Sequence, residues 1–150
     1  MRTAALVGER EVLALVLDTL IPAGEGFPPA SQVALDHVLS AAGESPVLDA
    51  LLTEGLREIE GAARATRADG IASLDADARE AVLRQIERAR PEFFGALLRQ
   101  TYDGYYAHPA VVARLGLDPG PVHPRGHRIE SSAPPELSRV AGRGPLYRPA

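Results

Sequence analysis

The segment PEFFGALLRQTYDGYYA, residues 91–107, decides the fold class of this chain. It begins with a proline, which suits the first turn of a helix because the missing N–H would have no partner there. Apolar and small side chains then recur every three or four residues, the spacing of one face of an α-helix. The residues on this stripe are Phe94, Leu97, Leu98, Thr101 and Tyr105. The pattern predicts a strongly amphipathic helix that packs on a core.

The same spacing predicts four helices before this segment, over about residues 9–20, 30–42 and 46–68, and a fourth that ends near Arg90. Gly43 is expected as a left-handed cap, and Ser45 and Pro46 as the start of the third helix. Ser73 and Asp75 compete to cap the fourth helix. A short sixth helix is expected over about 109–115, and no window alternates long enough to predict a strand.

We therefore predict an all-α fold, a helical bundle of about five helices with an irregular Pro/Arg-rich C-terminal tail. The body covers about residues 9–115 and the tail about 116–150. Both belong to one domain over 1–150, a length that suits a single compact unit.

Composition excludes several kinds of chemistry. The chain has no cysteine, which excludes disulfides, thiolate chemistry and Fe–S clusters. All 16 basic residues are arginine, which excludes a Schiff-base lysine and a P-loop. The formal net charge of −4 does not suit a general nucleic-acid binder. No apolar stretch is long enough to cross a bilayer, so we expect no direct membrane insertion.

Charge is unevenly distributed along the chain. Residues 109–150 carry six arginines against three acids, a surplus of three positive charges, so residues 1–108 carry a net charge of −7. Eight of the 13 prolines also lie in this last segment. The tail is therefore expected to be attracted to an acidic surface, either that of its own body or that of another subunit.

No arrangement of residues predicts catalysis or a metal site. None of the four histidines has a glutamate three residues before it, as a ferritin-like metal site requires. His37 is expected to be an ordinary helix residue. His123 and His127 are four residues apart, but Pro124 and Gly126 between them oppose the helix that this spacing requires. We predict no catalytic, cofactor or metal site in this chain.

Two segments indicate protein–protein contact. The connection over residues 21–29 includes the apolar or aromatic side chains Ile21, Pro22, Phe27 and Pro28, more than a plain helix–helix turn needs. They either cap the end of the bundle or form a rigid apolar knob for a partner. Three tyrosines over residues 102–106 form the second segment. Tyrosine is enriched at interfaces because it offers a large contact area at low entropic cost. The partner-binding candidates in these segments are Ile21, Pro22, Phe27, Pro28, Tyr102, Tyr105, Tyr106 and, directly after them, His108.

The tail supplies the remaining candidates. It lacks helical periodicity but keeps scattered apolar side chains, and its last part has the character of an extended arm with an aromatic anchor. The partner-binding candidates in the tail are Arg125, His127, Arg143, Tyr147 and Arg148.

Taken together, these motifs resemble the gluconate 2-dehydrogenase subunit 3 family. One is the Leu-Ile-Pro segment at residues 20–22 with the turn that follows to Ala30, where Pro29 replaces the usual glycine. The second is the pattern of Phe94, Leu97, Leu98, Thr101, Tyr105 and Tyr106. The third lies in the tail, in Leu115-Gly116, in residues 124–127 and in residues 143–148.

The resemblance implies a non-catalytic small accessory subunit that binds and stabilises or matures a large flavoprotein oxidoreductase of the glucose–methanol–choline (GMC) type. That large subunit holds FAD and oxidises a sugar or polyol. Such small subunits often carry a twin-arginine signal, but the sequence contains no Arg-Arg pair. We therefore expect a cytoplasmic protein, periplasmic only if it is exported with a signal-bearing partner.

Two alternatives remain open. One is an independent small helical enzyme or ligand-binding protein with a pocket under the tail that uses His108, His127 and the tyrosines. A pocket in which a histidine has a carboxylate partner would favour it. The other is a homo-oligomeric structural module with a self-complementary apolar face.

Overall fold

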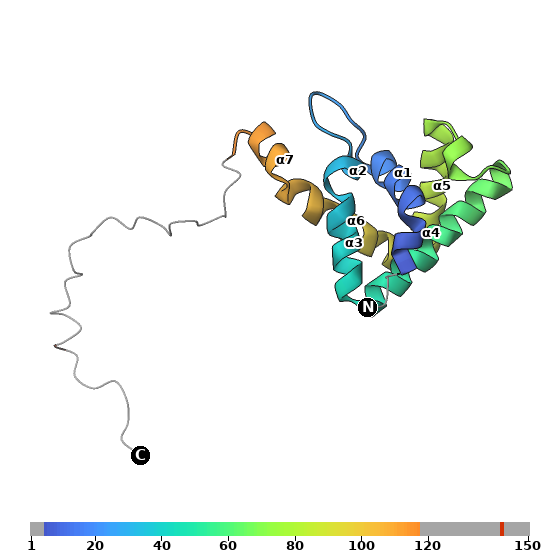
Figure 1. Cartoon of the computed structure of the whole chain (residues 1–150), viewed down its shortest axis with the longest axis horizontal. Coiled ribbons are helices and arrows are strands. Elements are labelled where there is room, and N and C mark those ends of the chain that lie inside the picture. The colour runs from blue at the N-terminus through green and yellow to red at the C-terminus, as the bar shows by residue number, and fades with distance from the viewer. Residues whose placement is uncertain (1–4, 118–141, 143–150) are drawn as a thin grey trace, which may run out of the picture. The chain divides into compact units, whose positions relative to one another are not determined.

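The computed structural model describes residues 5–117 and 142. In this part of the chain the structure is helical, and one isolated β-bridge between Gly24 and Phe27 is its only strand-like pairing. The predicted all-α fold is confirmed, while the predicted tail lies almost wholly outside the described residues. The prediction of one domain over 1–150 stays a prediction. The elements are η1 (Ala5–Glu9), α1 (Arg10–Leu20), α2 (Ala30–Val33), α3 (Leu35–Glu44), α4 (Pro46–Thr66), η2 (Ile71–Ser73), α5 (Ala76–Ala89), α6 (Pro91–Ala107) and α7 (Pro109–Arg114) (Figure 1).

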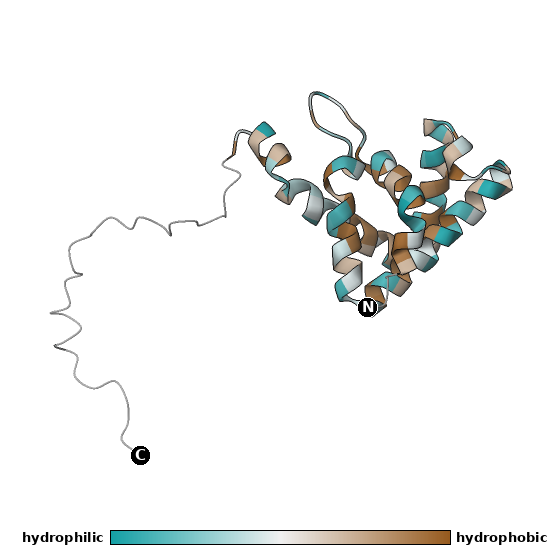
Figure 2. Ribbon diagram, viewed as in Figure 1, coloured by the Kyte–Doolittle hydropathy of each residue, from teal (hydrophilic) through white to brown (hydrophobic). Residues whose placement is uncertain are grey.

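Helix α6 packs against most of the other helices of this bundle. It contacts α2, α3, α4, α5 and α7, and hydrophobic residues gather on the faces that the helices turn toward one another (Figure 2). The stripe predicted from its spacing is buried at Phe94, Leu97, Thr101 and Tyr105, while Leu98 is half-buried. Phe93 is fully buried as well. Its ring lies against Gly55 of α4, so the backbone of α4 comes close to α6 at this point.

Ser45 joins α3 to α4 without a linker. It ends α3 in extended conformation (φ −130°, ψ 102°), and its side chain accepts a hydrogen bond from the Leu48 N–H at the start of α4. A residue before proline is pushed toward extended conformations, and Pro46 imposes this on Ser45. The predicted cap at Gly43 is therefore wrong: Gly43 lies inside α3, and the corner needs no left-handed residue.

Two other predicted boundaries change. The helix expected over 30–42 is divided at Ala34 into α2 and α3, but Ala34 stays in the right-handed helical region (φ −104°, ψ −20°), so the division is a kink. Asp75 is the cap of α5, because its carboxylate accepts from the Ala78 N–H at 2.9 Å. Ser73 lies in η2 and donates to the carbonyl of Gly70 instead.

Candidate functional site

The connection between α1 and α2 is a tight hairpin that projects beyond the helices (Figure 1). Its two central residues, Glu25 and Gly26, have φ values of 51° and 82°. Gly24 and Phe27 exchange backbone hydrogen bonds of 3.2 and 2.8 Å across them. Positive φ at both central positions is the geometry of a type I′ turn. Glycine adopts positive φ without strain, which suits Gly26 to the second of these positions. The segment is therefore a defined turn and not a loose loop.

The hairpin side chains divide between the core and the surface. Ile21 and Phe27 are half-buried and pack against the core, and Pro28 is also half-buried. Pro22 is exposed. The segment thus covers the end of the bundle with Ile21, Phe27 and Pro28 and presents Pro22 to solvent. The capping interpretation therefore describes most of the segment, and contact with a partner stays a prediction.

Arg114 of α7 holds the tip of the hairpin. Its Nη2 donates to the carbonyl oxygen of Glu25 at 2.9 Å. Its guanidinium carbon lies 5.9 Å from the centre of the Phe27 ring, within range of a cation–π interaction. The positive φ of Gly26 favours glycine there, and a Cβ at this position would displace the Arg114 guanidinium from its place over the hairpin.

The three tyrosines of α6 take the orientations that their spacing predicts. Tyr105 is 3% exposed, whereas Tyr102 and Tyr106 are 46% and 53% exposed. The Tyr106 ring lies edge-on to the Tyr105 ring at a centroid distance of 5.3 Å, and 5.9 Å from the Tyr102 ring. An aromatic patch, Tyr102 and Tyr106, is therefore offered to solvent on α6.

Tyr105 connects this patch to the hairpin. Its hydroxyl donates to the carbonyl oxygen of Pro28 at 2.8 Å. Burial raises the pKa of Tyr105 because the phenolate would be desolvated, and the neighbouring Tyr106 raises it further. The hydroxyl therefore keeps its proton and remains a donor to the hairpin.

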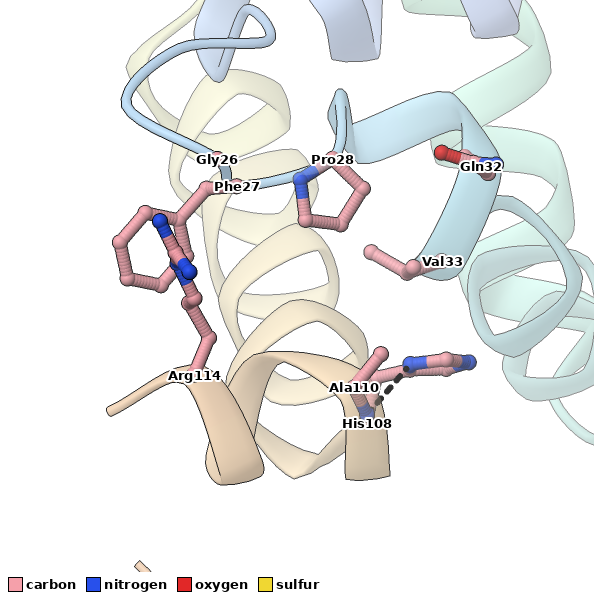
Figure 3. Close-up of a pocket in the computed structure, with 8 residues that line it drawn as sticks. All are labelled: Gly26, Phe27, Pro28, Gln32, Val33, His108, Ala110 and Arg114. Carbon is pink, nitrogen blue, oxygen red and sulfur yellow. Dashed lines mark hydrogen bonds between the residues drawn. The ribbon is translucent and has the colours of Figure 1, made fainter. Parts of the chain in front are cut away.

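A groove of about 640 Å³ runs between the hairpin, α2 and α7 (Figure 3). Phe27 and Arg114 lie at one end and His108 at the other, with Pro28, Val33 and Ala110 between them. The Nδ1 of His108 accepts from the Ala110 N–H at 3.3 Å and so caps α7. This is the only hydrogen bond of the His108 ring within the described residues, which give it no carboxylate partner.

His37 is an exposed residue of α3.

The structure brings Phe27, Pro28 and His108 together in the groove, while Pro22 lines a different hollow. It does not test whether the candidate residues bind a partner. That role stays a prediction. Arg125, His127, Arg143, Tyr147 and Arg148 lie outside the described residues. Sequence reasoning missed Arg114, Gln32, Val33 and Ala110 in the groove. Of these residues only Arg114 stands out in the sequence, as a basic residue in the last turn of a predicted helix. That position does not predict its hydrogen bond to Glu25.

Over residues 5–117 no three metal-ligating side chains lie close enough to hold a metal ion. Within the same range no helix has the length and apolar character needed to cross a bilayer.

Comparison with known families decides the relationship of this chain. The family model described as gluconate 2-dehydrogenase subunit 3 matches residues 8–119. The chain belongs to the gluconate 2-dehydrogenase subunit 3 family. No curated protein and no solved structure matches it. The subunit 3 match includes the hairpin, the three tyrosines and the whole groove. Of the tail motifs noted in the sequence, it includes Leu115-Gly116 and ends before residues 124–127 and 143–148.

Proposed function

We propose that this protein is a non-catalytic accessory subunit that binds a large FAD-dependent oxidoreductase subunit of the GMC type and stabilises or matures it. The observation that carries the proposal is the family match over residues 8–119, because the family is that of a gluconate 2-dehydrogenase subunit. A numbered subunit of a dehydrogenase implies at least one other chain in the complex. The substrate of the partner is a sugar or polyol, and this chain supplies no cofactor.

The described surface supports a binding role. Tyr102 and Tyr106 are exposed large aromatic side chains, the type that dominates binding energy at interfaces. Tyr105 holds the neighbouring hairpin through its bond to Pro28, so the hairpin beside the two exposed tyrosines is ordered before a partner binds. An ordered surface pays little conformational entropy on association.

Co-expression with a GMC-type large subunit encoded beside this chain tests the proposal. We expect a stable complex on size-exclusion chromatography and more flavin per large subunit, measured by absorbance at 450 nm. We place the complex in the cytoplasm, or in the periplasm if the large subunit carries the export signal. A large subunit that is equally soluble, flavin-loaded and active without this chain would refute an accessory role.

A matched pair of variants locates the binding energy. Replacing Tyr102 and Tyr106 by serine should weaken the complex by about 30-fold, the effect of losing an interface hot spot. Val47→Ser is the control, because Val47 is 80% exposed on α4 and loses an apolar side chain in the same way. If both variants bind the large subunit with equal affinity, the tyrosines do not contribute to the interface.

A further inference from the structure

The groove between the hairpin, α2 and α7 has a preformed shape. The type I′ turn fixes the hairpin tip, and Arg114 holds that tip to α7. The Tyr105 hydroxyl holds Pro28, and the Ala30 N–H donates to the Ile21 carbonyl at 3.0 Å, which closes the base of the hairpin. The wall formed by the hairpin is therefore fixed at its tip, its middle and its base. A ligand meets a groove that needs no ordering, which favours binding.

The chemistry of the groove selects the ligand. Its middle is lined by the apolar Pro28, Val33 and Ala110, which suit an aliphatic or aromatic side chain. The Arg114 guanidinium has five N–H donors in a rigid fork, and within the described residues one hydrogen bond uses it. The remaining donors match a carboxylate.

His108 adds a donor at the other end. Its Nδ1 accepts a backbone N–H, so the proton of the neutral ring must lie on Nε2. The eight residues that line the groove include Arg114 and His108 and no acidic residue. This composition is unusual on a body whose residues 1–108 carry a net charge of −7. The groove is thus a donor-rich site on an otherwise acidic protein.

We propose that this groove binds a segment of the large subunit that carries an apolar side chain beside a carboxylate. The carboxylate pairs with Arg114 and the apolar side chain lies along Pro28 and Val33. The proposal rests on the proposed function, because it names the contact through which the accessory subunit holds its partner. Residues 118–150 of this chain are less suitable ligands, because arginines outnumber acids there and weaken the attraction of their carboxylates to Arg114.

Site-specific photo-crosslinking locates the ligand. A benzophenone side chain is placed at Gln32, an exposed residue that lines the groove, or at Gln85, an exposed residue of α5 that does not. In the complex with the large subunit, the probe at Gln32 should crosslink to an acidic and apolar segment of that subunit, and the probe at Gln85 should not. A crosslink from Gln32 to residues 118–150, or to a second copy of this chain, would overturn the proposal.

Charge variants test the role of Arg114. Arg114→Gln removes the charge and leaves a neutral polar side chain, and should raise the Kd of the complex by about tenfold or more. It should also flatten the dependence of Kd on NaCl, which a purely structural role of Arg114 would not do. Arg114→Lys keeps the charge but not the planar fork of donors, and its Kd should lie between those of the wild type and Arg114→Gln. The control is Arg88→Gln on the exposed face of α5, with a Kd within twofold of the wild type.

The outcomes separate this inference from the proposed function. If no complex forms with the unaltered chain, the accessory role itself is refuted. If a complex forms and Arg114→Gln binds as tightly and with the same salt dependence as Arg88→Gln, the groove is not the contact and the accessory role stands.

Discussion

Two glycines of α4 should respond in opposite directions to the same substitution. Gly55 and Gly61 both lie inside this helix, where alanine is favoured over glycine by about 1 kcal/mol. Gly61 is exposed, and a Cβ there would meet nothing within 4 Å. Gly61→Ala should therefore stabilise the protein by about 1 kcal/mol.

At Gly55 the same gain is outweighed by a clash. The added Cβ would overlap three atoms of the Phe93 ring, which is fully buried between α4 and α6 and has no space to retreat. Overpacking a core costs about 1–3 kcal/mol, and an overlap with a rigid ring belongs at the upper end. Subtracting the helix-propensity gain leaves Gly55→Ala less stable than the wild type by about 2 kcal/mol.

Urea denaturation followed by circular dichroism measures both variants. The free energies of unfolding should differ by about 3 kcal/mol between them, with unchanged m-values. A third variant that combines Gly55→Ala with Phe93→Leu should recover part of the loss, because the smaller side chain makes room. If Gly55→Ala and Gly61→Ala are equally stable, α4 and α6 do not approach each other as closely as the packing of Phe93 on Gly55 requires.

Three further predictions concern hydrogen bonds and protonation. Tyr105→Phe leaves the Pro28 carbonyl without its donor and should cost about 1–2 kcal/mol in urea denaturation; a change below about 0.3 kcal/mol would contradict the role of this bond. Burial and the neighbouring Tyr106 raise the pKa of Tyr105 in the folded protein. As pH rises above 10, the Tyr105 hydroxyl therefore loses its proton in the unfolded chain before it does so in the folded protein. Stability should therefore fall as pH rises above 10, less steeply in Tyr105→Phe, and absorbance at 295 nm should show one late-titrating tyrosine. Asp75→Ala should cost about 1 kcal/mol in urea denaturation through the lost cap of α5, and Ser73→Ala should cost less in the same assay.

Local sequence patterns predicted most helices because the determinants lie within a few residues. Proline at residue 91 and the stripe after it place α6 at its observed bounds. Ser45 and Pro46 predict the start of α4 for the same reason, since a cap bonds only to the first turn. The prediction at Gly43 was wrong because the sequence offers glycine and Ser-Pro as two ways to end α3, and the helix continues through Gly43 to end at Ser45, where Pro46 favours the extended conformation.

The candidate site was predicted only in part. The apolar character of residues 21–29 and the tyrosine cluster are visible in the sequence, and helical spacing alone turns Tyr105 inward and Tyr102 outward. The groove is not visible there. It forms because α7 turns back beside the hairpin, and its lining residues come from three segments with no common motif.

The sequence by itself determined that this protein is helical, where most helices begin and end, and that it belongs to the gluconate 2-dehydrogenase subunit 3 family. Only the tertiary structure decided that Tyr105 bonds to Pro28 across 77 residues and that Arg114 bonds to Glu25 across 89. Helical periodicity depends on neighbours three and four positions apart. Contacts between distant segments depend on how whole helices pack, and in this protein that packing aligns the hairpin with both α6 and α7.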